Sequence, residues 1–195
     1  MLWQGAPTTA GLLVRVFHAR LVIAWFCLCA LAFGLAAGSP GAALAAVVPI
    51  LLVGAGALAL LWLLAWLTHR TTIYTVTTRR VVLQAGIALP MTHNLPFAQI
   101  ETAAVRAFTD GTGDLPLRLR PGLRIAYLQL WPHARPWRLT RTEPMLRSVP
   151  EADTVAGILA RALEAHAEAS EGALPVIVSR PRAVQEKSGR LVAAE

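Results

Sequence analysis

Residues 21–67 read LVIAWFCLCALAFGLAA-GSPG-AALAAVVPILLVGAGALALLWLLAWL, and they contain no charged side chain. A helix needs roughly 20 apolar residues to cross the hydrocarbon core of a bilayer. Two such runs, 21–37 and 42–67, lie on either side of the tetrapeptide GSPG, a combination that breaks helices. Because helices satisfy their own backbone hydrogen bonds in lipid, the stretch predicts a transmembrane helical hairpin.

The charges that flank the apolar runs predict how the hairpin is oriented. Arg15, His18 and Arg20 precede the first run, His69 and Arg70 follow the second, and the connecting loop is uncharged. Cytoplasmic flanks of membrane helices carry an excess of basic residues. We therefore expect a multi-pass membrane protein with both termini in the cytoplasm. A cleaved signal peptide is the disfavoured alternative, because a second long apolar run follows directly.

Composition and charge limit the classes of partner. The chain has 195 residues, a net charge of +7 and a mean hydropathy of +0.53. All 11 acidic residues lie after the apolar runs, in a segment long enough for one folded domain. A surplus of arginine beside a membrane hairpin favours membrane lipids over nucleic acid as the charged partner. Cys27 and Cys29 lie inside the first apolar run, so the sequence has no disulfide framework.

The residues after the hairpin follow the pattern of short strands. Short runs that are β-branched, aromatic or alternating, separated by Gly, Pro and Asx turns, predict strands at 71–78, 81–84, 91–95, 99–105, 115–119 and 125–130. An amphipathic helix is expected from Pro150 onward, with Val155 and Leu159 on its apolar face. The expected fold class is α+β: a two-helix transmembrane hairpin, then a β-barrel or sandwich of roughly six to seven strands capped by a C-terminal helix.

These patterns divide the chain into four parts. They are an approach segment, 1–20, the hairpin, 21–67, the sheet domain, 68–168, and a flexible tail, 169–195. The approach segment predicts an amphipathic helix from Gly11 to Arg20. The tail is polar and contains prolines, which is typical of disorder.

Several motifs resemble a known family. Residues 74–105, YTVTTRRVVLQAGIALPMTHNLPFAQIETAAV, resemble bacterial pleckstrin-homology-like (PH-like) domains through Y-x-x-T-x-x-R and a later P-x-x-Q-I step. Further segments are similar to the photosynthetic complex assembly proteins of purple bacteria, of the PuhB type: WQGAP at 3–7, FHAR at 17–20, DGTGDLPL at 110–117, and IAYLQLWPHARPWRL with EPMLRSVP within 125–150. The resemblance covers residues 3–165.

The resemblance implies a role in assembly and not in catalysis. Such a protein acts by protein–protein contacts on the reaction centre and the light-harvesting complex, in the intracytoplasmic membrane. The implied partners are reaction-centre and light-harvesting subunits, with bacteriochlorophyll synthase as a further candidate. No resident cofactor is expected, and transient bacteriochlorophyll contact through His18 or His69 is an alternative to structural roles for these histidines. Because the family normally has an acidic, Pro-rich lead before WQG, we expect the natural chain to begin upstream of Met1.

The run WPHARPWR, 131–138, is the first candidate site. Trp and Arg are over-represented at binding hot spots, and proline restricts the backbone. The candidate partner-binding residues are Trp131, His133, Arg135, Trp137 and Arg138. The alternative is a rigid corner whose tryptophans plug the barrel while its arginines lie at the surface.

A second candidate function is binding of anionic lipid headgroups by the sheet domain. The candidate residues are Arg79, Arg80, Arg118, Arg120 and Arg124. The small residues around Gly54 and Gly56 allow close approach of helices, so a homodimer is a further candidate assembly. The sequence predicts neither a metal site nor an enzyme: histidines lack ligand spacing, and DGTGD, 110–114, is typical of a hairpin turn and not of a phosphate loop.

Overall fold

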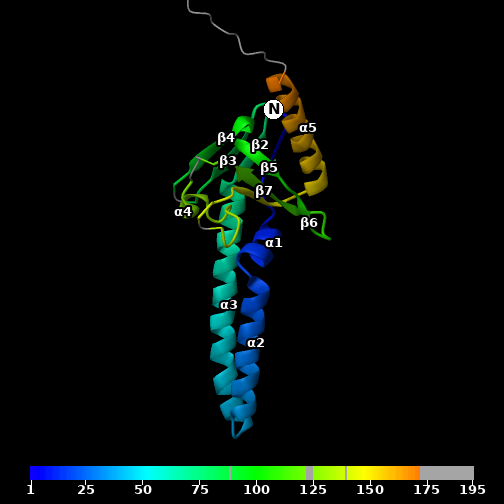
Figure 1. The fold of residues 1–195 in the computed structure, drawn as a ribbon. Coiled ribbons are helices and arrows are strands. Elements are labelled where there is room, and N and C mark those ends of the chain that lie inside the picture. The colour runs from blue at the N-terminus through cyan, green and yellow to red at the C-terminus, as the bar shows by residue number, and fades with distance from the viewer. Residues whose placement is uncertain (88, 122–124, 139, 172–195) are drawn as a thin grey trace, which may run out of the picture.

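The computed structural model describes residues 1–87, 89–121, 125–138 and 140–171 (Figure 1). Helices α2 (Ala19–Ala36) and α3 (Pro40–Thr71) form a long antiparallel hairpin that projects from a domain of sheets. Both helices are long and apolar enough to cross a membrane, and only 6% of each apolar window is buried within the chain. Ser39 caps α3, because its Oγ accepts a hydrogen bond from the Ala42 backbone N–H at 3.3 Å.

Two glycines allow close packing within the hairpin: Gly34, where a Cβ atom would lie 3.2 Å from the side chain of Val47, and Gly54. A Cβ atom at Gly54 would lie 2.9 Å from the ring of Phe26, so a larger side chain there would displace that ring. Gly56, two residues later, has no neighbour within 4 Å among the described residues. Gly54 therefore serves the contact between α2 and α3, whereas Gly56 lies on the exposed side of the helix.

Two antiparallel sheets make up the domain. The first sheet has the order β1 (Trp3–Gly5), β2 (Ile73–Val76), β3 (Arg80–Ala85) and β4 (Met91–Pro96). A short 3₁₀ turn, η2, leads from β4 to the second sheet. That sheet contains β5 (Ile100–Ala103), β7 (Gly113–Leu119) and β6 (Arg106–Ala107) in this order, and β8 (Met145–Val149) pairs with β7. In the described part of the chain the sheets do not close into a barrel, so the fold is the open form of the predicted barrel or sandwich.

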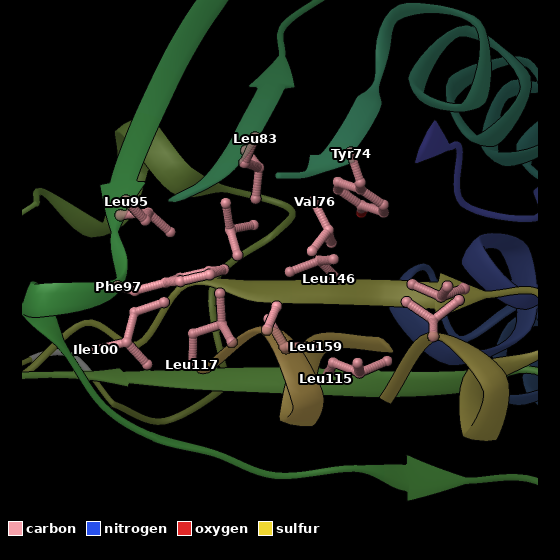
Figure 2. Close-up of a cluster of buried hydrophobic side chains, with 14 of the residues drawn as sticks. Tyr74, Val76, Leu83, Leu95, Phe97, Ile100, Leu115, Leu117, Leu146 and Leu159 are labelled. Carbon is pink, nitrogen blue, oxygen red and sulfur yellow. The ribbon is translucent and has the colours of Figure 1, made fainter. Parts of the chain in front are cut away.

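The core lies between the two sheets and α5 (Ala152–Glu171). Residues of β2 and β3 alternate between buried and more exposed positions, as expected for strands with one face on a core. Figure 2 shows Val76 and Leu83 of the first sheet meeting Leu117 and Leu146 of the second, with Leu159 of α5 between them. The predicted α+β class with a C-terminal helix is confirmed.

The hairpin is an insertion between two paired strands. β1 precedes α2 in the sequence, β2 follows α3, and the two strands pair with Trp3 opposite Val76 and Gly5 opposite Tyr74. Both ends of the hairpin are therefore held at one edge of the same sheet.

The structure corrects the sequence-based expectations in two segments. Residues 125–130, predicted as a strand, instead contain the helical turn α4 (Tyr127–Leu130). In a strand Leu128 and Leu130 would share a face, but here Leu128 is exposed and Leu130 is buried. The approach segment is not one regular helix: α1 (Thr9–Gly11) continues into the π-helical turn η1 (Leu12–Val16). Near the end of this segment lies His18, which has a φ of 53° and separates η1 from α2.

Two further observations concern strands and the C-terminal tail. Strands β1 and β8 were not expected from the sequence. The predicted flexible tail begins inside α5, which extends to Glu171, and the remainder of that prediction lies outside the described residues.

Candidate functional site

The loop from Trp131 to Arg138 presents two tryptophans at the surface. Trp137 is 95% exposed and Trp131 is 52% exposed, so neither plugs the core between the sheets. The ring of Trp131 packs edge-on against Phe17, with centroids 6.2 Å apart. Phe17 lies just before α2, and the segment after α4 accordingly lies beside the domain end of the hairpin (Figure 1). Arg135 and Arg138 are exposed in the same loop.

His133 anchors this loop from inside. It is fully buried, and its ring lies between the Tyr74 hydroxyl, 2.7 Å from Nδ1, and the Thr72 hydroxyl, 3.1 Å from Nε2. The Tyr74 oxygen accepts the backbone N–H of Arg147 at 3.2 Å, so its own proton is free to go to His133 Nδ1. His133 Nε2–H then donates to Thr72. Of the five candidate partner-binding residues, His133 is the one that the structure places away from the surface.

Burial keeps this cluster neutral. Desolvation, with smaller contributions from the charges of Arg147 and His93, lowers the pKa of His133 to about 3. Desolvation also raises the pKa of Tyr74. The imidazole and the phenol are therefore both uncharged near neutral pH, and they link α3, β2 and the loop through hydrogen bonds alone.

Arg147 of β8 is a buried cation beneath the same loop. It is 8% exposed, and one terminal nitrogen donates to the Pro132 carbonyl at 3.3 Å. Its Nε has no hydrogen-bond partner among the described residues. Desolvation lowers the pKa of its guanidinium.

The DGTGD motif joins the approach segment to the sheet. Arg15 of η1 donates to Asp110 Oδ2 and to Thr112 Oγ1, each at 2.6 Å. The Thr112 hydroxyl also donates to the Asp110 carboxylate, and these two partners lower the pKa of Asp110 to about 2. Asp110 and Thr112 lie in the turn between β6 and β7, so the motif fastens η1 to the second sheet.

A pocket of about 770 Å³ lies between these elements. One wall comes from the approach segment, a second from β6, β7 and β8, and a third from the loop that contains the two tryptophans. Its ionisable lining residues are Arg15, His18, Arg106, Asp114, Arg135 and Arg147, of which four are arginines. The pocket is therefore predominantly basic, and it lies at the point where the hairpin enters the domain.

Comparison with known proteins shows the family. Residues 19–163 match a family model described as a bacterial PH domain. The chain belongs to the bacterial PH domain family. The match to this bacterial PH domain begins at the first residue of α2 and includes both apolar helices as well as the sheets.

A relative of this bacterial PH domain protein comes from Rhodobacter capsulatus. It is described as an uncharacterized 23.7 kDa protein in the puhA 5′ region, and it is 36% identical over 191 residues. The alignment covers 94% of this chain and 86% of the relative. No solved structure matches the chain significantly.

The arginines predicted to bind lipid headgroups lie elsewhere in this bacterial PH domain. Arg79 lies in the turn between β2 and β3, and Arg80 is the first residue of β3, at the end of this strand pair where Val76 lies opposite Trp3 of β1. Arg118 lies on β7, 3.9 Å from Glu101 and 4.0 Å from Glu143. Arg120 is exposed just after β7, and Arg124 lies outside the described residues. None of the described members of this set lines the pocket.

The two histidines considered for pigment contact flank the hairpin. His18 Nδ1 donates to the Val16 carbonyl at 2.9 Å, and His69 Nδ1 donates to the Pro7 carbonyl at 2.6 Å. Each contact fixes the orientation of the ring and uses Nδ1, so Nε2 is the ring nitrogen that these hydrogen bonds do not use.

Sequence reasoning missed the residues that build the pocket and its support. Tyr74, Arg106 and Arg147 were not among the candidates, although Tyr74 and Arg147 lie in the quoted motifs YTVTT and EPMLRSVP. An arginine in the middle of a short apolar run, as in MLRSV, was the available signal, because a buried arginine is rare.

Proposed function

We propose that this protein is a membrane-anchored assembly factor of the PuhB type, which acts by protein–protein contacts on the photosynthetic reaction centre and its light-harvesting complex. Its relative in Rhodobacter capsulatus lies in the 5′ region of the reaction-centre gene puhA. The observation that carries the proposal is the exposed tryptophan of the loop: Trp137, at 95% exposure, lies on a segment anchored by His133 beside the hairpin.

In this proposal α2 and α3 cross the inner, intracytoplasmic membrane and both termini are cytoplasmic. The pairing of β1 with β2 supports it, because strands in one sheet must lie on the same side of the membrane. Arg15, Arg20 and Arg70 at the domain end of the hairpin agree with a cytoplasmic location. The GSPG turn then lies alone on the opposite side.

The loop is suited to binding a membrane-embedded partner close to the cytoplasmic surface. A large aromatic side chain on a fixed backbone loses little conformational entropy on binding. Trp is also a frequent hot-spot residue. Because the hairpin confines the protein to the membrane that holds its partners, weak contacts are sufficient for association.

The test is recovery of partners from phototrophic membranes. We expect tagged full-length protein, extracted in a mild detergent, to retain reaction-centre or light-harvesting subunits or bacteriochlorophyll synthase, read by mass spectrometry and near-infrared absorption. Trp137→Ala should reduce recovery about tenfold or more, as expected for a hot-spot residue. Leu89→Ala is the matched control, because Leu89 is a similarly exposed apolar residue outside the loop, at 73% exposure.

The result that would contradict the proposal is equally definite. If the wild-type protein recovers neither a reaction-centre or light-harvesting subunit nor bacteriochlorophyll synthase, while the tagged protein is intact and in the membrane fraction, the assembly role is wrong. Equal loss in the Trp137→Ala and Leu89→Ala variants would remove the loop as the contact surface.

A further inference from the structure

The pocket beside the hairpin has a charge distribution that the proposed protein contacts do not explain. Arg15 is paired with Asp110 at 2.6 Å, and Arg135 is paired with Glu143 at 2.7 Å. Arg106 and Arg147 have no carboxylate within 4.0 Å among the residues that the structure describes. The pocket thus contains two cations that lack a carboxylate partner.

The acidic residue in the lining does not neutralise them by contact. Asp114 is buried, and its Oδ1 accepts the backbone N–H of Ser148 at 2.8 Å. The guanidinium of Arg106 instead lies over the ring of Phe108, 5.5 Å from its centroid. An aromatic face stabilises a cation but leaves its charge in place.

Arg147 distinguishes the pocket from an ordinary solvent-exposed basic surface. Its side chain lines the pocket although it is only 8% exposed. Its guanidinium donates to the Pro132 carbonyl at 3.3 Å, and its Nε has no partner in the described part of the chain. The charge of Asp114 favours the guanidinium of Arg147 but forms no ion pair with it. Burial of a cation that lacks an ion pair is unfavourable unless further negative charge approaches it. An anion held in this pocket would provide that compensation.

The location of the pocket identifies the class of anion. His18 lines the pocket, and the next residue, Ala19, begins the first apolar helix. Polar groups at the end of a membrane helix lie at the level of the lipid headgroups. Trp131 and Trp137 also line the pocket, and tryptophan is enriched at that level of the bilayer. A volume of about 770 Å³ lies within the usual range for ligand pockets, so a headgroup fits.

We propose that this pocket binds the phosphate of an anionic phospholipid headgroup, with Arg106 and Arg147 as the phosphate-binding side chains. Arginine suits this role because its planar fork of N–H donors matches phosphate oxygens. The acyl chains of the bound lipid lie along the hairpin. The phosphate-binding side chains, Arg106 and Arg147, are not among the proposed protein-contact residues, although the loop that contains Trp131 and Trp137 lines the pocket as well. The inference does not depend on the assembly role.

The experiment uses the full-length protein in a neutral detergent. Dihexanoyl-phosphatidylglycerol is titrated against phosphatidylcholine of the same chain length, and binding is followed by tryptophan fluorescence and native mass spectrometry. We expect one phosphatidylglycerol to bind with clear preference. Arg106→Gln and Arg147→Met should each weaken its binding about tenfold, the effect of one charged hydrogen bond. Arg79→Gln, at the far end of the domain, is the matched control and should bind like the wild type.

Each outcome has a definite meaning. If Arg147→Met fails to fold by circular dichroism, Arg106→Gln alone decides, because Arg106 is exposed and outside the core. Equal affinity for the two lipids, or unchanged binding by Arg106→Gln, overturns the proposal. Competition by glycerol 3-phosphate or inorganic phosphate as strong as that by the lipid overturns the lipid as the source and supports a soluble phosphate compound. Loss of reaction-centre subunits in Arg106→Gln with no lipid bound overturns the lipid site and makes the pocket a protein-docking site.

Discussion

The hairpin and the sheet domain place their apolar side chains in opposite directions. In α2 and α3 only 6% of the apolar windows are buried, and Leu52 is 67% exposed. In the domain Leu83 and Leu146 are fully inaccessible. The same residue type therefore has different surroundings in the two regions: the domain excludes water from its leucines with its own side chains, whereas the chain leaves the apolar outer surface of the hairpin uncovered.

The contacts between the hairpin and the domain differ from the apolar packing within the domain. Where the hairpin meets the domain, His133 contacts Thr72 just after α3, and Arg15 contacts Asp110 in the turn before β7. Gly11 of α1 lies so close to Ser148 that a Cβ atom there would be 2.5 Å from the serine oxygen. Polar side chains and one close backbone approach thus join the hairpin to the domain, together with the edge-on contact between Phe17 and Trp131.

The largest expected effect tests the comparison directly. Leu146→Ala should lower the free energy of unfolding by about 3 kcal/mol, because it leaves a cavity in a closed core. Leu52→Ala on the outside of α3 should change it by less than about 0.5 kcal/mol. Thermal unfolding of the full-length protein in detergent measures both. An equal loss for the two variants would mean that the outside of the hairpin packs against protein, for example a second copy.

A second test sharpens the account of the hairpin itself. Gly54→Leu should cost about 2 kcal/mol, because the new side chain must displace the ring of Phe26. Gly56→Leu is the matched control, and it should leave stability unchanged or slightly raised because glycine is a poor helix former. Unfolding in the same detergent gives the difference. If Gly54→Leu were neutral, the two helices would not pack closely at this position.

The buried His133 tests whether the junction between the hairpin and the domain excludes water as the core of the domain does. Its folded pKa of about 3 is below the ordinary value of 6.5, so between these values the unfolded chain binds a proton that the folded chain excludes. Its contribution is complete above pH 6.5 and is lost as the pH falls toward 3. Stability should drop by about 1–2 kcal/mol between pH 6.5 and pH 5.

The variants at this site separate the buried histidine from exposed ones. Unfolding scans of His133→Gln across the same pH range should lack this slope, although the variant is less stable throughout. His18→Gln, which changes an exposed histidine, should keep the wild-type slope. A wild-type slope in His133→Gln would show that other groups are responsible.

The smallest effect concerns the exposed ion pair of the junction. The pKa of Asp110, lowered to about 2 from 3.8, means that its contribution is present above about pH 4 and is lost as the pH falls through 2. Asp110→Asn should lower the melting temperature slightly at pH 5, and the difference from the wild type should shrink at pH 2.5. Arg15→Gln should show the same small difference, because exposed pairs contribute little. A difference that persisted unchanged at pH 2.5 would exclude the ion pair as its cause.

The sequence predicted those elements whose pattern has one physical interpretation. A long run without charge specifies apolar helices, and β2 and β3 follow from β-branched runs. β4 and β7 follow from short segments bounded by turn residues, with alternating leucines in β7. β8 could not be predicted because Arg147 and Ser148, both buried, interrupt its apolar pattern. β1 could not be predicted either, because it has only three residues and its partner strand lies beyond the hairpin in the sequence.

The pocket was beyond sequence reasoning for a related reason. Its arginines come from η1, β6, β8 and the loop after α4, which are far apart in the sequence. The sequence instead favoured Arg79 and Arg80 because they are adjacent, and the structure places them at the opposite end of the domain. Residues that are adjacent in the sequence can be recognised without a structure. A site whose residues come from distant segments can be recognised only when the fold is known.

The pairing of β1 with β2 has a consequence for biosynthesis. A ribosome releases β1 first, then both apolar helices, and only then the strand that must lie beside β1. With the hairpin spanning the membrane as proposed, the first sheet forms only after two insertion events have returned the chain to its starting side. A chain that crossed the membrane only once would leave β2 on the opposite side from β1. The incomplete sheet would then expose its edge to quality-control proteases. Correct topology in the membrane is thus a prerequisite for folding of the domain.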